Sequence, residues 1–186
     1  MIRGERVVLR AIESGDLERC HQWMNDPEVK RFLSMRFPIS MVQEKQWVEG
    51  ERDPNKELHL AIEALEGEHI GNCGLMNRDT ISRHAELGIV IGNKEYWSKG
   101  YGTDAMLTLC GFGFTQMNLH RICLRVLDVN ARGIRCYEKC GFQHEGRLRE
   151  AEFKHGAYHD MLLMSILADE FREQWPERWP TGAGEQ

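Results

Sequence analysis

The sequence predicts one α/β (α+β) domain, built on a mixed sheet of seven strands with helices on both faces. A chain of 186 residues that is 41% hydrophobic can bury one sizeable core, but not comfortably two. Strands in the middle of the chain follow one another directly, whereas helices separate the later strands, as crossover connections do. No repeat or linker divides the chain. We therefore expect a single domain over residues 1–176 and a flexible tail over residues 177–186.

One strand and three short helices are expected in the first part of the chain. Residues 6–11 alternate between apolar and polar positions, as a strand does. Each helix should begin at a residue that caps helices, with a proline after the second cap. The candidate caps are Ser14, Asp26 before Pro27, and Ser40. The second helix should run through Leu33 and the third through Val48.

The rest of the chain is expected to supply six strands and two helices. A period of two indicates the strands, at residues 57–64, 70–76, 85–91, 121–127, 147–153 and 158–167. A helical period indicates the helices, at residues 101–116 and 130–140. His155 and Gly156 fit a turn between the last two strands.

Composition and charge argue against a protein that binds nucleic acid, spans a membrane or is secreted. The formal net charge is −5, which argues against a nucleic-acid partner because phosphate backbones require a basic face. No apolar run reaches the length of a membrane helix, and the first residues lack the apolar stretch of a secretory signal. We therefore expect a cytoplasmic protein without a membrane partner. Its cysteines are expected to be free thiols, at positions Cys20, Cys73, Cys110, Cys123, Cys136 and Cys140.

A glycine pair follows the strand that ends near Ile91. Gly100 and Gly102 stand at the start of a predicted helix, where free backbone N–H groups and the helix dipole favour a phosphate. Alternatively, the two glycines only shape a strand-to-helix turn and bind no ligand. A dinucleotide fingerprint, with Asp128 as its acidic residue, is disfavoured because it belongs to successive parallel βαβ units.

The surrounding residues resemble the pyrophosphate loop of the GNAT acetyltransferases, which reads Gln/Arg, two residues, Gly, one residue, Gly/Ala. Here the run is Trp97-Ser98-Lys99-Gly100-Tyr101-Gly102-Thr103, with tryptophan in the Gln/Arg place, as is common in the RimJ/RimL branch. Further matches follow in the family's order over nearly the whole chain. They are Asn25-Asp26-Pro27-Glu28-Val29, Ile70-Gly71-Asn72-Cys73-Gly74-Leu75, Ala85-Glu86-Leu87-Gly88, and Asn130 with Tyr137 and Lys139-Cys140-Gly141-Phe142.

The resemblance implies a mostly antiparallel GNAT sheet, acetyl-CoA as acetyl donor and an amine as acceptor. It implies that residues 97–103 hold the pyrophosphate. It also implies that the Asn130 amide and the main chain of Ile89 and Ile91 hold the pantetheine arm. The acceptor could be the N-terminal amine of a ribosomal protein. It could also be a polyamine such as spermidine, an amino sugar or an aminoglycoside. A CoA-binding module without catalysis is a further alternative, and a homodimer is frequent in the family.

Amine attack on a thioester needs a donor for the leaving thiolate and a sink for the amine proton. The resemblance makes Tyr137 the candidate donor; otherwise its ring only packs beside Ile134. Glu86 is a candidate proton sink or amine anchor, and otherwise a surface residue.

Two further groups of side chains lie on or just after the predicted helix over residues 130–140. Arg132, Arg135 and Lys139 share one helical face, which either contacts the 3′-phosphate of CoA or is a solvated basic face. Cys136 and Cys140 with His144 lack a fourth ligand, so no metal site is expected.

Overall fold

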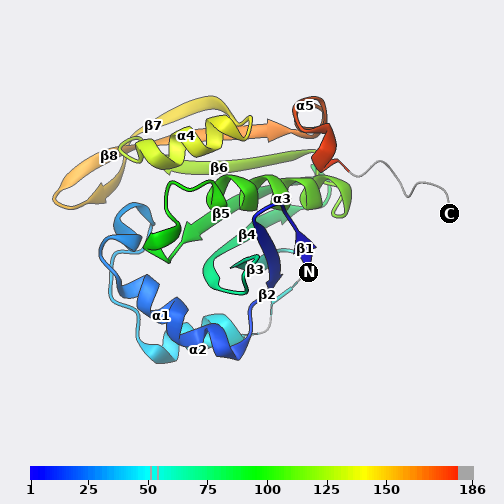
Figure 1. Cartoon of the computed structure of the whole chain (residues 1–186). Helices are drawn as coiled ribbons and strands as arrows, with labels where there is room; N and C mark the ends of the chain where they lie inside the picture. Colours follow the sequence, from blue (N-terminus) through cyan, green and yellow to red (C-terminus); the bar gives the residue numbers. More distant parts are fainter. Residues whose placement is uncertain (51, 54, 180–186) are drawn as a thin grey trace.

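One continuous sheet of eight strands runs through the computed structural model, which describes residues 1–50, 52, 53 and 55–179 (Figure 1). Its strand order is β1-β2-β3-β4-β5-β6-β8-β7. Within the described residues, only β5 and β6 pair in parallel. The strands are β1 (Ile2–Arg3), β2 (Val7–Ala11), β3 (Leu58–Ala64), β4 (His69–Asp79), β5 (His84–Ile91), β6 (Arg121–Leu127), β7 (Gln143–Lys154) and β8 (Ala157–Leu167).

The predicted mixed sheet is confirmed, but its strand count was one too low. The additional strand is β1, which pairs with β2 through Ile2 opposite Leu9. Two residues are too few to show a period of two, so the pattern could not reveal this strand. The strands β4 and β7 are also longer than predicted, since β4 continues to Asp79 and β7 begins at Gln143.

The helices are α1 (Leu17–Asn25), α2 (Met41–Glu49), α3 (Tyr101–Thr115), α4 (Ala131–Lys139) and α5 (Ala168–Gln174). Short 3₁₀ turns are η1 (Ser14–Asp16), η2 (Val29–Phe32), η3 (Lys94–Tyr96) and η4 (Pro176–Arg178). The Oγ of Ser40 accepts the N–H of Gln43 at 3.3 Å, so the predicted cap of α2 is confirmed. Among the described helices, none is long and apolar enough to cross a membrane.

Two predictions near the start of the chain were wrong in detail. Ser14 does not cap a helix; it lies inside η1, and the N–H of Glu13 donates to the Asp16 carboxylate at 2.9 Å. The second predicted helix is only the 3₁₀ turn η2. The Asp26 carboxylate accepts the N–H of Glu28 at 2.8 Å, which closes a local turn instead of starting an α-helix. The sequence pattern also gave no sign of α5.

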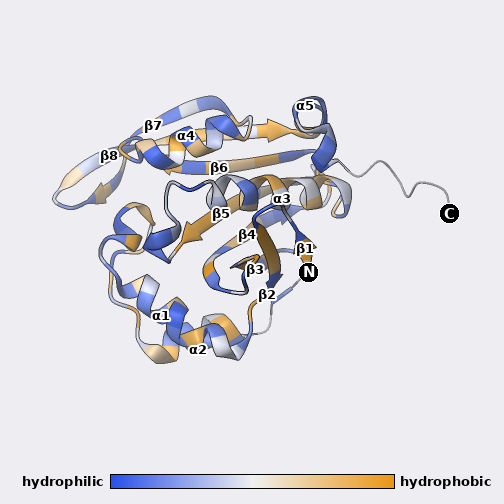
Figure 2. Ribbon diagram, in the orientation of Figure 1, coloured by the Kyte–Doolittle hydropathy of each residue, from blue (hydrophilic) through white to orange (hydrophobic). Residues whose placement is uncertain are grey.

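Helices cover both faces of the sheet. On one face, α3 lies so close that a Cβ at Gly113 would stand 3.1 Å from both Leu75 and Ile122. The apolar strands beneath it are visible in Figure 2, and their inward side chains form the core. On the other face, the Asn72 amide of β4 donates to the Cys20 sulfur of α1 at 3.2 Å. The central strands therefore lie between two layers of helices, with α3 packed on one face and α1 on the other.

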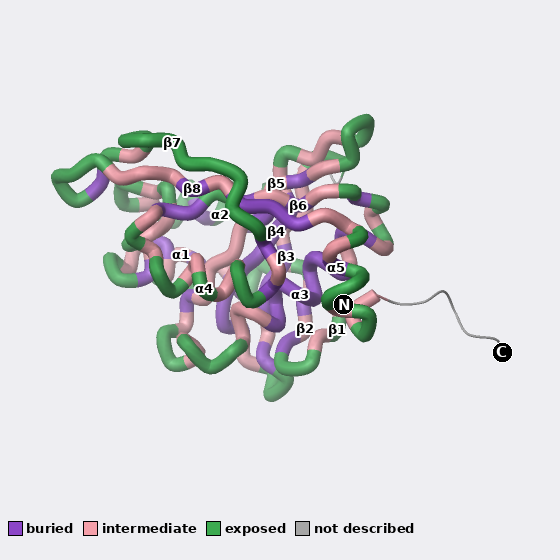
Figure 3. The backbone as a smooth tube through the Cα atoms, turned by 90° about the horizontal axis from the view of Figure 1, so that it is seen from above, coloured by how far each residue is buried: buried purple, intermediate pink, exposed green. Residues whose placement is uncertain are grey.

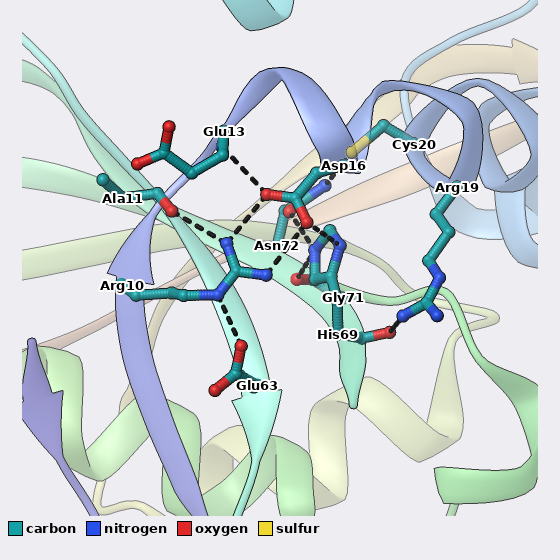
Figure 4. Close-up of polar contacts among 10 residues, drawn as sticks. All are labelled: Arg10, Ala11, Glu13, Asp16, Arg19, Cys20, Glu63, His69, Gly71 and Asn72. Atoms are coloured by element: carbon teal, nitrogen blue, oxygen red, sulfur yellow. Dashed lines mark hydrogen bonds and ion pairs between the residues drawn. The ribbon is translucent and has the colours of Figure 1, made fainter. Parts of the chain in front are cut away.

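A partly buried ionic cluster fixes the segment before α1 to the sheet (Figure 4). Arg10 of β2 donates to both oxygens of the Asp16 carboxylate, at 2.8 and 2.9 Å, and to Glu63 at 2.6 Å. Burial alone would raise the pKa of Asp16, but the hydrogen bonds from Arg10 and from the backbone of Glu13 lower it to about 2. His69 lies with its Nδ1 3.0 Å from the same carboxylate. This cluster holds α1 against β2 and β4.

The hairpin of β7 and β8 reaches beyond the rest of the sheet, and β7 is exposed along nearly its whole length (Figures 1 and 3). Its predicted turn at His155 and Gly156 is confirmed, and both residues have positive φ angles. The buried Lys154 amine donates to the backbone carbonyls of Lys30, at 2.9 Å, and Leu33. Residues 30–33 are therefore held against the tip of the hairpin, although they lie more than a hundred positions away in the chain.

A second buried carboxylate joins the start of α3 to both ends of the described chain. Asp104 accepts the N–H groups of Glu5, Arg6 and Val7, at 3.2, 2.7 and 3.1 Å. It also accepts a hydrogen bond of 2.6 Å from the guanidinium of Arg178 in η4. The predicted boundary at residue 176 thus falls inside a segment that contacts α3 as far as residue 179, and residues 180–186 lie outside the described residues.

Replacing Arg178 with glutamine should lower the free energy of unfolding by about 1.5–3 kcal/mol, because a buried carboxylate would lose its cationic partner. Urea unfolding measures this. The control is Arg172→Gln, which removes an exposed pair with Asp169 and should cost at most about 1 kcal/mol. Equal stability of the two variants would contradict the anchoring role of Arg178.

Candidate active site

The two parallel strands diverge, and a cleft opens between them. The strands β5 and β6 pair only from His84 opposite Arg121 to Glu86 opposite Cys123. Beyond that point β5 continues to Ile91 without a strand partner on this side among the described residues. A cleft of about 590 Å³ lies in the gap and is lined by Ile89 and Ile91. It stands at the carboxyl ends of parallel strands, a usual place for a ligand in a sheet of this kind.

The turn before α3 presents a row of free donors. Gly100, the N-cap of α3, has φ +89°, a left-handed conformation that favours glycine, and Ser98 also has a positive φ of 59°. Within the described residues, no acceptor is bound to the backbone N–H groups of residues 98–103. Consecutive free N–H groups at a helix start form a strong anion site. This turn is therefore suited to hold a pyrophosphate.

The predicted loop residues divide into two sets. Trp97, Ser98, Gly100, Gly102 and Thr103 line the cleft.

The other two predicted loop residues, Lys99 and Tyr101, do not line the cleft. Lys99 is exposed to solvent. The ring of Tyr101 packs edge-on against Tyr96, with ring centroids 4.8 Å apart. The lysine, the loop's cation in the sequence, is thus not placed to meet a ligand inside the cleft.

Asn130 forms the opposite wall at the start of α4. Its Oδ1 accepts the N–H of Gly133 at 3.0 Å, so the side chain caps α4. Its Nδ2 has no acceptor among the described residues, and the residue lines the cleft. The same side chain can therefore cap the helix with its oxygen and donate to a ligand with its nitrogen.

Tyr137 also lies on this wall, in the last turn of α4. Its ring is half-buried, 6.4 Å from that of Phe142 between centroids, and lines the cleft. The hydroxyl makes no hydrogen bond within the part of the chain that the structure describes. Burial raises the pKa of Tyr137 above its ordinary value, so the phenol is protonated at neutral pH. It can act as a proton donor there, but not as a base.

Glu86 stands where β5 and β6 part. One of its carboxylate oxygens accepts Arg125 Nε at 2.7 Å, and the other accepts Asn77 Nδ2 at 3.1 Å. Both Glu86 and Arg125 line the cleft. Both oxygens are thus hydrogen-bonded within the fold, and the contact with Arg125 shows that this carboxylate can hold a cation. The sequence gave no sign of its partner Arg125.

The basic face of α4 lines the cleft too, which the sequence had left open. Arg132, Arg135 and Lys139 all border it. Among the described residues, no carboxylate lies within 4 Å of their charged groups. These cations are therefore available to an anionic ligand.

Cys136 is a cleft residue to which the sequence gave no role. Its sulfur lies 3.4 Å from the Thr103 hydroxyl, beside the turn. Hydrogen bonding from the Cys140 thiol, with a smaller contribution from Thr103, lowers the pKa of the Cys136 thiol. All six cysteines are free, as predicted. Within the described residues, no group of three His, Cys, Asp or Glu side chains is arranged to hold a metal ion.

Comparison with known proteins agrees with this geometry. A model of the acetyltransferase (GNAT) domain matches residues 6–143. The chain belongs to the GNAT acetyltransferase family. This match covers the diverging strands, the turn before α3, and Asn130 and Tyr137 of α4.

Several relatives of the family cover almost the whole chain. A spermidine N(1)-acetyltransferase of Vibrio cholerae is 30% identical over 166 residues, which are 89% of this chain and 95% of that protein. An uncharacterized N-acetyltransferase, p20 of Bacillus licheniformis, is 30% identical over 172 residues, covering 90% of this chain and 96% of its own. The crystal structure of spermidine N-acetyltransferase from Vibrio cholerae with CoA and spermine has a TM-score of 0.84 and 30% identity. It matches 89% of this chain and 98% of that one.

The chain is thus an acetyl-CoA-dependent N-acetyltransferase of GNAT fold. The finer assignment to the RimJ/RimL branch stays a prediction.

Proposed function

We propose that this GNAT enzyme acetylates a small aliphatic amine with more than one positive charge, and that a polyamine such as spermidine is its acceptor. The observation that carries the proposal is a pair of carboxylates from distant strands in one cleft. Glu86 of β5 and Glu152 of β7 both line it. A polyamine alternates ammonium groups with methylene segments, so carboxylates set among apolar side chains suit it.

The apolar part of this surface comes from several elements. Phe32 and Leu33 belong to the segment that Lys154 ties to the hairpin, and Met76 and Met161 come from β4 and β8. Glu152 is paired with Arg36 at 2.7 Å, as Glu86 is with Arg125. An incoming ammonium would share or replace these guanidinium groups, which orient the carboxylates before the acceptor binds.

The relatives support a small acceptor. Two relatives that match 89% of this chain are named for spermidine, whereas YdaF of Bacillus subtilis, named as a putative ribosomal N-acetyltransferase, matches 57% of it. The earlier predicted acceptor, a ribosomal N-terminus, therefore takes second place. Amino sugars and aminoglycosides remain alternatives within the same chemical class, since they too carry several amines.

The acetyl donor, acetyl-CoA, would occupy the other end of the cleft. The pyrophosphate of acetyl-CoA would lie on the N–H groups of residues 98–103, and the pantetheine arm beside Ile89, Ile91 and Asn130. The thioester would then stand near Tyr137, with the acceptor amine approaching from the side of Glu86. A homodimer and a cytoplasmic location stay predictions.

Replacing Glu86 with glutamine should raise KM for spermidine by about 10-fold or more, because a charged hydrogen bond to the ammonium is lost. The KM for acetyl-CoA should stay the same, because Glu86 lies away from the pyrophosphate turn. Thiol release measures both values, with spermidine, spermine, an N-terminal ribosomal peptide and an aminoglycoside as parallel acceptors.

The matched control is Glu63→Gln, since Glu63 is also a strand carboxylate paired with an arginine but does not line the cleft. It should leave both KM values unchanged. Turnover of the peptide but not of spermidine would overturn the polyamine proposal. An unchanged spermidine KM in Glu86→Gln would remove Glu86 from the acceptor site.

A further inference from the structure

Trp97 stands in the loop position where the family's pattern has glutamine or arginine. Unlike those two side chains, it cannot donate a hydrogen bond to a phosphate here. The indole of Trp97 has a single donor, Nε1–H. That donor is already bound to the Ile91 carbonyl at 2.7 Å. No donor of this side chain is left for a phosphate oxygen. Lys99 does not line the cleft either, so residues 97–103 offer a phosphate no charged side chain from within the cleft.

A cation reaches the turn from another element instead. The Cζ of Arg132, on the first turn of α4, lies over the Trp97 ring at 3.8 Å from its centroid. Both side chains line the cleft. Within the part of the chain that the structure describes, the five N–H donors of this guanidinium bind no acceptor. The indole of Trp97 thus holds the guanidinium by a cation–π contact, and this contact leaves the N–H donors of Arg132 free.

We propose that Arg132, positioned by Trp97, binds the pyrophosphate of acetyl-CoA and replaces the side chain that the loop lacks at position 97. The inference rests on the proposed placement of acetyl-CoA in this cleft. A guanidinium suits the task because it donates several hydrogen bonds from one plane and stays charged at every physiological pH. Trp97 is a positioning residue, and Arg132 is a binding residue.

The alternative contact is the 3′-phosphate of CoA, and two ligands separate it from the pyrophosphate. Dephospho-CoA lacks the 3′-phosphate but keeps the pyrophosphate. Calorimetric titration of Arg132→Gln should therefore give a Kd about 10- to 100-fold higher for both CoA and dephospho-CoA, with the same factor for each. A loss confined to CoA would overturn the assignment, and so would Kd values within about twofold of the wild type.

The matched control is Arg172→Gln. Arg172 also lies over a tryptophan ring, that of Trp179 at 5.6 Å, but does not line the cleft. This variant should bind both ligands as the wild type does. If the wild type itself failed to bind CoA, the proposed placement of the cofactor would fail, which is a different result from an unaffected Arg132→Gln.

The positioning role of Trp97 is tested by the same calorimetric measurement of the Kd for CoA. Trp97→Leu should weaken CoA binding by a smaller factor, about 2- to 5-fold, since the cation–π contact is worth less than the phosphate contact. Trp97→Phe keeps an aromatic face and should restore most of the affinity. In the Arg132→Gln background, Trp97→Leu should have no further effect. Equal losses from Trp97→Leu in both backgrounds would show that the indole acts independently of Arg132.

Discussion

Gly102→Glu should raise the Kd for acetyl-CoA by at least about 100-fold, because it places a carboxylate against the pyrophosphate. The fold should tolerate the change. A Cβ at position 102 would meet Ile91 at 3.7 Å and Cys136 at 4.0 Å, which are ordinary contacts. Unlike Gly100, Gly102 has no positive φ that requires glycine. An acidic residue in the first turn of α3 also interacts favourably with the helix dipole.

Stability and affinity should therefore move in opposite directions, which separates this effect from simple unfolding. Calorimetry gives the affinity and thermal melting gives the stability. Gly102→Ala is the control: it should stabilise α3 slightly, since alanine is the better helix former, and should weaken binding far less than glutamate. A folded Gly102→Glu variant that binds acetyl-CoA normally would remove the turn from the cofactor site.

Much of the fold could be predicted because local signals agreed with tertiary packing. The glycine at position 100 marked the start of α3, and Ser40 capped α2 through its own hydroxyl. One failure shows a contact between different elements at work. The helix predicted to start at Ser14 begins with a 3₁₀ turn, because the carboxylate of Asp16 is held by Arg10 of a strand. A contact with another element overrode the local propensity.

The candidate site could be predicted in part, where function depends on the backbone. Glycines at positions 100 and 102 signal a turn that leaves room for a ligand, and Asn130 signals a cap. Side-chain contacts between different helices and strands could not be predicted in this way. Arg125 beside Glu86, and Arg132 over Trp97, each join residues about 35 to 40 positions apart, at distances that only the folded chain sets. The resemblance to the family names the loop, but not the side chains that complete it here.

Tyr137→Phe should lower turnover by about 100-fold while leaving acetyl-CoA affinity unchanged, if the phenol protonates the departing thiolate. The phenylalanine ring keeps the contact with Phe142 and deletes only the donor. The hydroxyl binds no acceptor among the described residues, so its removal leaves no partner unsatisfied. Because burial raises the pKa of Tyr137, the phenol stays protonated through the neutral range. Its ionisation should therefore cause no fall in rate as the pH rises toward about 10.

Steady-state rates with a confirmed acceptor, measured from pH 6 to pH 9, decide between the acid and a packing role. The matched control is Tyr158→Phe, because Tyr158 is exposed on β8 and does not line the cleft. It should keep the wild-type rate. Tyr137→Ala adds a cavity to the lost donor, so it should lower stability as well as turnover. If Tyr137→Phe stays within about twofold of the wild type across this range, the donor role is excluded, because general acid catalysis contributes far more than that. Tyr137 would then serve the cleft only as a packed ring, and the proton of the leaving thiol would have to come from water.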